Sequence, residues 1–224
     1  MTKNVEITVD IKIARMMLRI AGFAFVDKKT DNFVDVFEQN GISVSEPTDK
    51  QKEKVLALLD KDIRAKVKRV YKIVPHAQKK KFEEYVKKNN ISKDKYKSLW
   101  HGSRNQNWLS IIINSLQLKP NAIITGKMFG HGIYFAPSSK KSYNYTSLNG
   151  TYWAKGTENT AYMGLYVTAY GDPLDVYQSY QYNKNNIQGK NCVHAHAGKA
   201  LLNDEIIYYD EAAMYLSYLV ELGA

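Results

Sequence analysis

A histidine followed directly by glycine is the first feature with residue types suited to chemistry. The stretch reads Leu-Trp-His-Gly-Ser over residues 99–103, with His101 at its centre and a strand-like run before it. Glycine at 102 lets a ligand approach the backbone closely. A lone histidine is more often structural than catalytic, so this stretch alone leaves both roles open for His101.

Three glycines in seven residues mark a second stretch, Thr-Gly-Lys-Met-Phe-Gly-His-Gly-Ile-Tyr-Phe-Ala over residues 125–136. They indicate a bent or closely approached backbone before a strand. The stretch is neither a Walker loop nor a dinucleotide fingerprint, because the glycine spacing differs and a strand follows instead of a helix. Taken alone, it is explained equally well by a simple tight turn.

Two further stretches place polar groups beside aromatic or apolar side chains. Lys-Lys-Ser-Tyr-Asn-Tyr over residues 140–145 suits a flat, polar heteroaromatic ligand, or equally a helix that buries Tyr145. Asn-Asp-Glu-Ile-Ile-Tyr-Tyr-Asp over residues 203–210 brings Glu205 into an apolar strand. A buried carboxylate is costly unless it has a partner, so Glu205 either has one or faces water at a strand edge.

The elements that must position these residues predict an α+β domain over residues 66–224. Val67, Arg69 and Tyr71 alternate with other residues as in a strand. Runs rich in tyrosine, valine and isoleucine predict strands at 98–102, 132–136, 163–169, 175–178 and 205–210. Helices are predicted at 79–88, 108–116 and 140–145. With few long helices, antiparallel sheets are favoured over a parallel βαβ fold.

Residues 1–65 predict a separate, mainly helical N-terminal region. Apolar residues at helical spacing indicate a helix over 11–22 and a shorter one around Phe33 to Phe37. Residues 41–50 have the composition of a loop. Thr48 or Asp49 then caps a third helix that continues to Ile63.

Composition favours a cytosolic protein, with a nuclear location open if the source is eukaryotic. No apolar run is long enough to cross a bilayer, and the first ten residues carry acidic groups where a signal peptide is apolar. The single cysteine, Cys192, fits a reducing compartment. The net charge of +10 includes a dense basic stretch at residues 61–88. This stretch is explained equally by contact with nucleic acid and by solvated helix faces.

Taken together, in this order and spacing, the four stretches resemble the catalytic domain of the poly(ADP-ribose) polymerase family. The quoted parts are Leu-Trp-His-Gly-Ser, Gly-x-Met-Phe-Gly-x-Gly-Ile-Tyr-Phe-Ala, Lys-Ser-x-Asn-Tyr and Asn-x-Glu-x-Ile-x-Tyr. The resemblance extends over about residues 66–222. It implies an ADP-ribosyltransferase fold of two packed, mostly antiparallel sheets, and NAD as substrate.

The resemblance also implies how NAD is bound. By that similarity His101 contacts the adenosine ribose, with Gly102 and Ser103 beside it, and the Gly102 backbone and the Ser142 hydroxyl contact the nicotinamide amide. Tyr134 and Tyr145 sandwich the nicotinamide ring. Residues 119–130 match the family's loop over NAD, and Lys127 and His131 near its end are expected to touch the pyrophosphate.

For catalysis the resemblance implies a set of His101, Tyr134 and Glu205. Breaking the bond to nicotinamide develops positive charge on the ribose, which a fixed carboxylate stabilises. The same carboxylate polarises an acceptor hydroxyl as a general base. We expect no metal requirement, and His194 and His196, two residues apart, form no convincing metal motif by themselves.

Several questions stay open at the level of sequence. Glu205 permits polymer synthesis as well as transfer of single units, to an acceptor that is either protein or nucleic acid. Two alternatives to the transferase are a non-catalytic module that binds NAD or ADP-ribose and a basic nucleic-acid-binding protein. Residues 1–65 are too short for the family's whole helical subdomain, so we expect NAD binding without autoinhibition.

Overall fold

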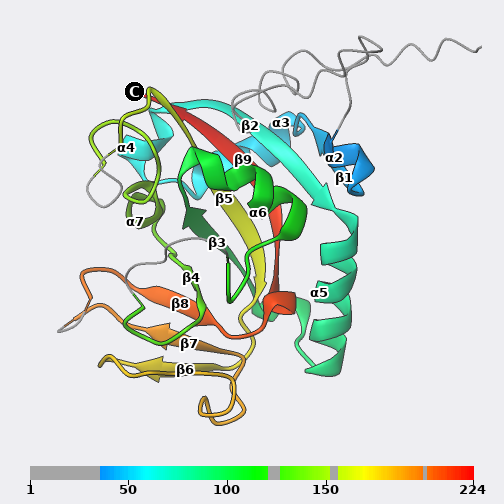
Figure 1. The fold of residues 1–224 in the computed structure, drawn as a ribbon, viewed down its shortest axis with the longest axis vertical. Helices are drawn as coiled ribbons and strands as arrows, with labels where there is room; N and C mark the ends of the chain where they lie inside the picture. The colour runs from blue at the N-terminus through cyan, green and yellow to red at the C-terminus, as the bar shows by residue number, and fades with distance from the viewer. Residues whose placement is uncertain (1–35, 121–126, 152–155, 199–200) are drawn as a thin grey trace, which may run out of the picture.

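Two β-sheets dominate the architecture. The computed structural model describes residues 36–120, 127–151, 156–198 and 201–224. Within them the larger sheet has the order β1-β2-β9-β5-β3 and the smaller the order β4-β8-β7-β6. Every pairing between these strands is antiparallel except that of β6 with β7. Figure 1 shows the small sheet below the large one. The predicted α+β fold of two mostly antiparallel sheets is therefore confirmed.

The large sheet has its most buried strands in the middle. β5 (Thr160–Ala169) pairs with β9 (Met214–Gly223) on one side and with β3 (Tyr96–Gly102) on the other. β2 (Val67–Pro75) pairs with the other side of β9, and β1 (Ile42–Ser45) forms the far edge. The strands predicted from Val67, at 98–102 and at 163–169 are confirmed, whereas β9 was not among the predicted strands.

The small sheet supplies the two remaining stretches singled out in the sequence. Its strands are β4 (Ile133–Phe135), β6 (Pro173–Val176), β7 (Cys192–Ala195) and β8 (Glu205–Tyr208). The predicted strands at 132–136 and 205–210 are confirmed with shorter bounds, and the one at 175–178 begins and ends two residues earlier. A bridge between Trp100 and Ala136 connects the end of β4 to β3 in the other sheet.

Apolar side chains between the sheets hold this arrangement together. Phe135 of the small sheet and Tyr166 of the large one meet edge to face, with ring centroids 5.1 Å apart. Tyr208 packs against the other side of Phe135 at 5.7 Å. All three are buried in one cluster. Truncating such a core aromatic to alanine typically costs about 3–5 kcal/mol, so this cluster fixes how the sheets sit relative to each other.

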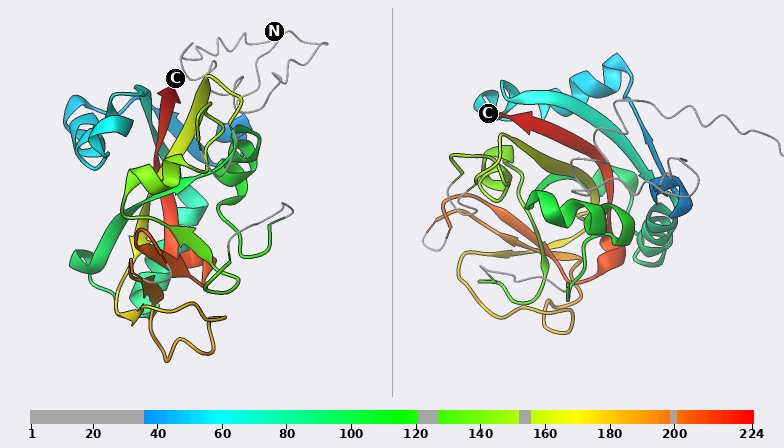
Figure 2. Two further views of the ribbon diagram at one scale, coloured as in Figure 1. Left: turned by 90° about the vertical axis from the view of Figure 1, so that its left-hand side faces the viewer. Right: turned by 45° about the horizontal axis from the view of Figure 1, so that its top comes forward.

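The helices cover the sheets through a few buried residues each. α5 (His76–Lys88) buries Phe82 and Val86, and α6 (Trp108–Asn114) buries Trp108 and Ile112. α7 (Ser139–Tyr143) lies beside β3. Three short 3-10 helices complete the set, η1 (Lys93–Lys95), η2 (Asn105–Asn107) and η3 (Glu211–Ala213). Figure 2 shows the small sheet at one end of the molecule in a second orientation.

The segment before β2 corrects two expectations. Residues 41–50, expected to be a loop, contain β1, because the alternation of Ile42 and Val44 with serines suits a strand that pairs with β2. The third helix begins as predicted at a Thr48 cap, but it is divided into α3 (Asp49–Ala57) and α4 (Lys61–Arg64).

The N-terminal helices share a core with the large sheet. α2 (Val36–Gln39) follows the residues outside the described part, where the predicted helix over 11–22 also lies. Val55 of α3 and Ile63 of α4 pack in one cluster with Val70 of β2 and Trp100 of β3. The division at residue 65 remains a prediction, and its two sides meet in this cluster.

Candidate active site

His101, the histidine of the first motif, lies on β3 with one ring nitrogen committed to the backbone. Its Nδ1 is 3.0 Å from the Tyr134 carbonyl oxygen. Because a carbonyl only accepts hydrogen bonds, Nδ1 carries the proton and Nε2 is the acceptor nitrogen. Burial lowers the pKa of His101, against the smaller opposing effect of this hydrogen bond. The imidazole is therefore neutral at pH 7, in one defined tautomer.

The residue after His101 is glycine because β3 and α7 approach each other closely at position 102. A Cβ atom at this position would lie 1.8 Å from the Ser142 carbonyl oxygen. Real Cβ atoms do not come this near to a backbone oxygen, so any side chain would push α7 away from β3. The two residues that the resemblance assigns to the nicotinamide amide, Gly102 and Ser142, are thus in backbone contact.

Tyr134 is held by the glycine-rich turn that precedes β4. Its hydroxyl donates to the Gly130 carbonyl at 2.8 Å and accepts from the Phe129 N–H at 3.0 Å. Burial, with a smaller contribution from the negative charge of Glu205, raises the pKa of Tyr134 to about 12. The phenol is neutral at physiological pH, and two hydrogen bonds hold its hydroxyl in place.

The glycines of that turn have separate structural reasons. Gly130 has a φ of +84°, and a Cβ there would meet the backbone of Tyr182. At Gly132 a Cβ would lie 2.3 Å from the Ile207 side chain on β8. The turn is thus a closely packed backbone, which agrees with the expectation drawn from the glycine spacing.

Glu205, the first residue of β8, forms a nearly buried ion pair. Its Oε1 lies 2.7 Å from the Lys141 Nζ, and the two side chains are only 12% and 13% exposed. Lys141 also donates to the Asn203 carbonyl at 3.0 Å. This is the partner that a buried carboxylate requires, so the alternative of a carboxylate facing water does not apply.

Lys141 is a residue that the sequence reasoning missed. Its signal was available, because Lys141 directly precedes Ser142 in the third motif. The negative charge of Glu205 also contributes to raising the pKa of Tyr145, after burial as the larger cause. The third and fourth motifs therefore meet at one place, with α7 supplying a cation and β8 a carboxylate.

Asp60 is a second missed residue, and it fixes α7 from outside. Its Oδ2 accepts from the Ser138 and Ser139 hydroxyls at 3.0 and 2.7 Å and from the Lys140 N–H at 2.8 Å. Burial works to raise the pKa of Asp60, but these hydrogen bonds outweigh it and the pKa is lowered. The Asp60 N–H donates to Ser139 in turn, at 2.8 Å.

The other residues predicted to bind NAD lie near the solvent or form hydrogen bonds with neighbouring residues. Lys127 and His131 contact each other on the surface. The Ser103 hydroxyl accepts from the Asn107 amide at 2.9 Å. Tyr145 is 37% exposed. Residues 121–126 of the expected loop over NAD are outside the described part of the chain.

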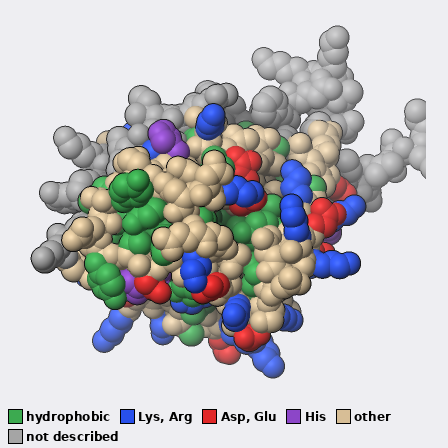
Figure 3. Space-filling model, turned by 90° about the horizontal axis from the view of Figure 1, so that it is seen from below, with side chains coloured by type: hydrophobic (Ala, Val, Ile, Leu, Met, Phe, Trp, Pro, Cys, Tyr) green, Lys and Arg blue, Asp and Glu red, His purple; other side chains and the backbone are tan. Residues whose placement is uncertain are grey.

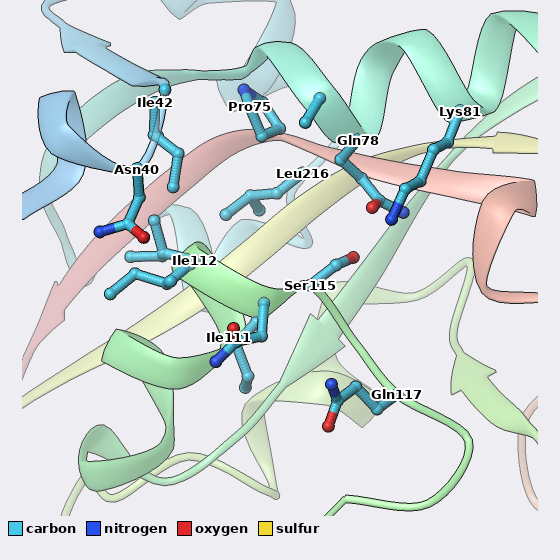
Figure 4. Close-up of a pocket in the computed structure, with 14 residues that line it drawn as sticks. Asn40, Ile42, Pro75, Gln78, Lys81, Ile111, Ile112, Ser115, Gln117 and Leu216 are labelled. Carbon is cyan, nitrogen blue, oxygen red and sulfur yellow. The ribbon is translucent and has the colours of Figure 1, made fainter.

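A separate hollow of about 230 Å³ lies between β1, α5 and α6. Figure 4 shows its apolar floor of Ile42, Ile112 and Leu216, with Gln78 and Gln117 at the margin. None of the predicted catalytic or NAD-binding residues lines it. The chemistry of the four motifs is therefore not located in this hollow.

Comparison with known proteins identifies the family of this chain. Residues 49–201 match the model of the poly(ADP-ribose) polymerase catalytic domain. The chain belongs to this family. Within the described residues, no helix combines the length and apolar character that a membrane span needs.

Individual relatives have the same family name. Human poly(ADP-ribose) polymerase 2 is 40% identical over 93 residues, which are 41% of this chain and 15% of that protein. The Drosophila melanogaster enzyme is 28% identical over 186 residues, 70% of this chain and 18% of the fly protein. The polymerase-like protein 100L of Invertebrate iridescent virus 6 is 26% identical over 165 residues, 69% of this chain and 84% of the viral one. The chain thus spans a small part of the human and fly relatives.

Proposed function

We propose that this poly(ADP-ribose) polymerase domain transfers ADP-ribose from NAD to an acceptor and releases nicotinamide. The observation that carries the proposal is the nearly buried Glu205 on β8, paired with Lys141. Its charge also acts on Tyr134 and Tyr145, the two predicted walls for the nicotinamide ring.

Nicotinamide recognition follows from the contact between β3 and α7. Gly102 is only partly buried and has no side chain, so a planar amide can approach its backbone from the side away from Ser142. The Ser142 hydroxyl supplies a further polar group on the buried side of α7. Tyr134 is fixed by its hydroxyl bonds, so its ring is pre-organised for stacking on the pyridine.

His101 acts through its fixed tautomer. With Nδ1–H committed to Tyr134, Nε2 accepts a hydrogen bond and is suited to a ribose hydroxyl of NAD. This contact requires the neutral ring, which burial favours. NAD is thereby oriented from its adenosine end while the nicotinamide end is enclosed.

Glu205 performs the chemical step in this proposal. As the bond between ribose and nicotinamide breaks, positive charge develops on the sugar, and a carboxylate fixed beside it stabilises that charge. Lys141 holds the carboxylate in one position. The same oxygen atoms then accept the proton of the attacking acceptor hydroxyl.

Nicotinamide release from NAD by the purified chain tests the proposal. Glu205→Gln keeps the shape and removes the charge, and we expect at least a 100-fold loss of release, as for other pre-organised charge-stabilising groups. Glu158→Gln changes an exposed carboxylate and is the matched control, with activity unchanged. Full activity in Glu205→Gln contradicts the assignment. NAD binding by the wild-type chain without release of nicotinamide supports the non-catalytic module instead.

We further propose that the acceptor side includes nucleic acid and that the activity is cytosolic. Supporting the first point, α5 exposes the lysines at 79–81, 87 and 88, all within the basic stretch at 61–88. A phosphate contact through these lysines weakens steeply as salt is raised. Labelled products analysed with and without nuclease, and sized on gels, distinguish protein from nucleic acid acceptors and single units from polymer.

A further inference from the structure

Two histidines and two aspartates gather on the small sheet, on the face opposite Glu205. Asp175 on β6 and His194 on β7 are register partners, and His196 follows β7 with its N–H bonded to the Val176 carbonyl. Asp204 directly precedes β8. Figure 3, which views the small-sheet end of the molecule, shows histidine and acidic side chains side by side at the surface.

The four side chains are arranged as a stacked pair between two carboxylates. The imidazoles of His194 and His196 have centroids 3.9 Å apart and planes inclined by 28°. Asp175 Oδ1 lies 2.6 Å from His196 Nε2 and 3.7 Å from His194 Nδ1. On the opposite edge, Asp204 Oδ2 lies 3.0 Å from His194 Nε2 and 3.7 Å from His196 Nδ1.

We propose that Asp175, His194 and His196 bind a divalent transition-metal ion of the zinc class. The three ligand atoms all lie within 4.8 Å of one another. Zinc binds imidazole nitrogen and carboxylate oxygen at about 2.0–2.2 Å, so small side-chain rotations bring all three onto one ion. Two imidazoles and one carboxylate are a donor set that this ion accepts, with water in the remaining position.

Asp204 orients the ring of His194 from the side opposite the proposed ion. When it accepts the Nε2–H of His194, the Nδ1 of that ring keeps its lone pair on the side of Asp175. Its second oxygen, Oδ1, accepts from the Ala197 N–H at 2.8 Å, so the carboxylate is itself fixed. A carboxylate behind a ligating histidine is the usual support of zinc sites. With neutral imidazoles the two aspartates give the cluster two negative charges, which a divalent ion balances.

Tyr170 provides a sharper test of the geometry. Its hydroxyl lies 2.7 Å from His194 Nδ1, the nitrogen that the ion needs, and donates to it if Nε2 is protonated. The hydroxyl therefore competes with the ion. Tyr170→Phe removes the competitor, and we expect tighter metal binding, an effect that a purely hydrogen-bonded cluster would not produce.

The proposed ion is distinct from the transferase site. Glu205 pairs with Ala195 across β7 and β8, while His194 pairs with Ile206. Because neighbouring residues of a strand face opposite sides, His194 and Glu205 point to opposite faces of the sheet. The ion would connect β6 with β7, and Asp204 before β8 would support it through His194, so the expectation of metal-independent catalysis is unaffected.

Calorimetry with the untagged full chain, stripped with chelator and titrated with Zn²⁺, tests the site. We expect one ion per chain, a raised melting temperature with Zn²⁺, and d–d absorption bands when Co²⁺ is used. Asp175→Asn combined with His196→Gln should remove this ion, and Asp204→Asn should weaken it about 10–100-fold. His76→Gln, at an exposed histidine outside the cluster, should change nothing.

Two outcomes overturn the proposal. One is a wild-type chain that binds no Zn²⁺, and the other is an affinity that survives the double substitution. The aspartate at 175 has a side chain that is 55% exposed, so Asp175→Asn by itself gives a folded variant for the same measurement. Nicotinamide release is not a readout here, so the result stands apart from the proposed transferase activity.

Discussion

Asp204 and Glu205 are neighbours in the chain, but they belong to two different regions of the molecule. Glu205 lies in a nearly buried pair with Lys141, whose side chain is 13% exposed. Asp204 has a side chain that is 36% exposed and contacts two histidines on the other face of the sheet. Burial and the identity of the partner, more than residue type, therefore determine what a carboxylate contributes. In the proposed function the charge of Glu205 acts on a reacting sugar, whereas Asp204 accepts a hydrogen bond from the His194 imidazole.

Lys141→Met, which breaks the ion pair with Glu205, is expected to lower the free energy of unfolding more than the other substitutions below. Breaking a buried pair by removing one partner typically costs about 3–5 kcal/mol, because the other charge stays buried. Chemical denaturation measures this loss, and nicotinamide release should fall as well. Lys140→Met is the matched control, because Lys140 pairs with Asp62 at the surface and should change stability by less than about 1 kcal/mol. Equal losses of stability in both variants would contradict the contrast between the buried and the exposed ion pair.

Gly102→Ala tests whether α7 must lie against β3 for the Glu205 region to form. The added Cβ meets the Ser142 carbonyl, and overpacking of this kind costs about 1–3 kcal/mol. We expect a raised KM for NAD together with a lower melting temperature. At Gly223 an added Cβ meets only the Lys68 side chain, which moves readily, so Gly223→Ala is the control. An unchanged KM for NAD in Gly102→Ala would mean that the contact between β3 and α7 does not affect NAD binding.

Asp60→Asn tests the outer support of α7 and has a pH dependence with a defined sign. Losing the charged cap should cost about 1 kcal/mol at pH 7. Because the folded-state pKa of Asp60 is lowered, its stabilisation is present above the unfolded pKa and is lost as pH falls through the folded pKa. The difference in unfolding free energy between wild type and variant should therefore shrink in acid. Asp62→Asn, at an exposed neighbour paired with Lys140 at the surface, is the control and should change stability by less than about 1 kcal/mol at pH 7.

Asp204→Asn in metal-free protein should give the smallest effect. A partly exposed carboxylate paired with histidines contributes about 1 kcal/mol or less. Nicotinamide release should stay within about twofold of wild type. A loss of activity as large as that of Lys141→Met would mean that the two faces of the small sheet are not independent.

Local sequence patterns predicted much of the fold and the position of each motif. The apolar runs at 98–102, 163–169 and 205–210 are strands because β-branched and aromatic side chains suit a sheet buried on one or both faces. β1 was missed because its serines and a nearby proline have the composition of a loop. Its strand state depends on pairing with β2, which lies some thirty residues farther along.

The four motifs, their order, and the need of a carboxylate in an apolar strand for a partner can be read from the residues alone. That this partner is Lys141, and that Asp60 binds the start of α7 from 79 residues away, is known from the fold. It also placed Asp204 and Glu205 on different faces, with two histidines behind one and a lysine beside the other. The reason is physical. Periodicity and turn chemistry act between near neighbours in the chain, whereas ion pairs and close backbone contacts depend on which strands and helices the folded sheets bring together.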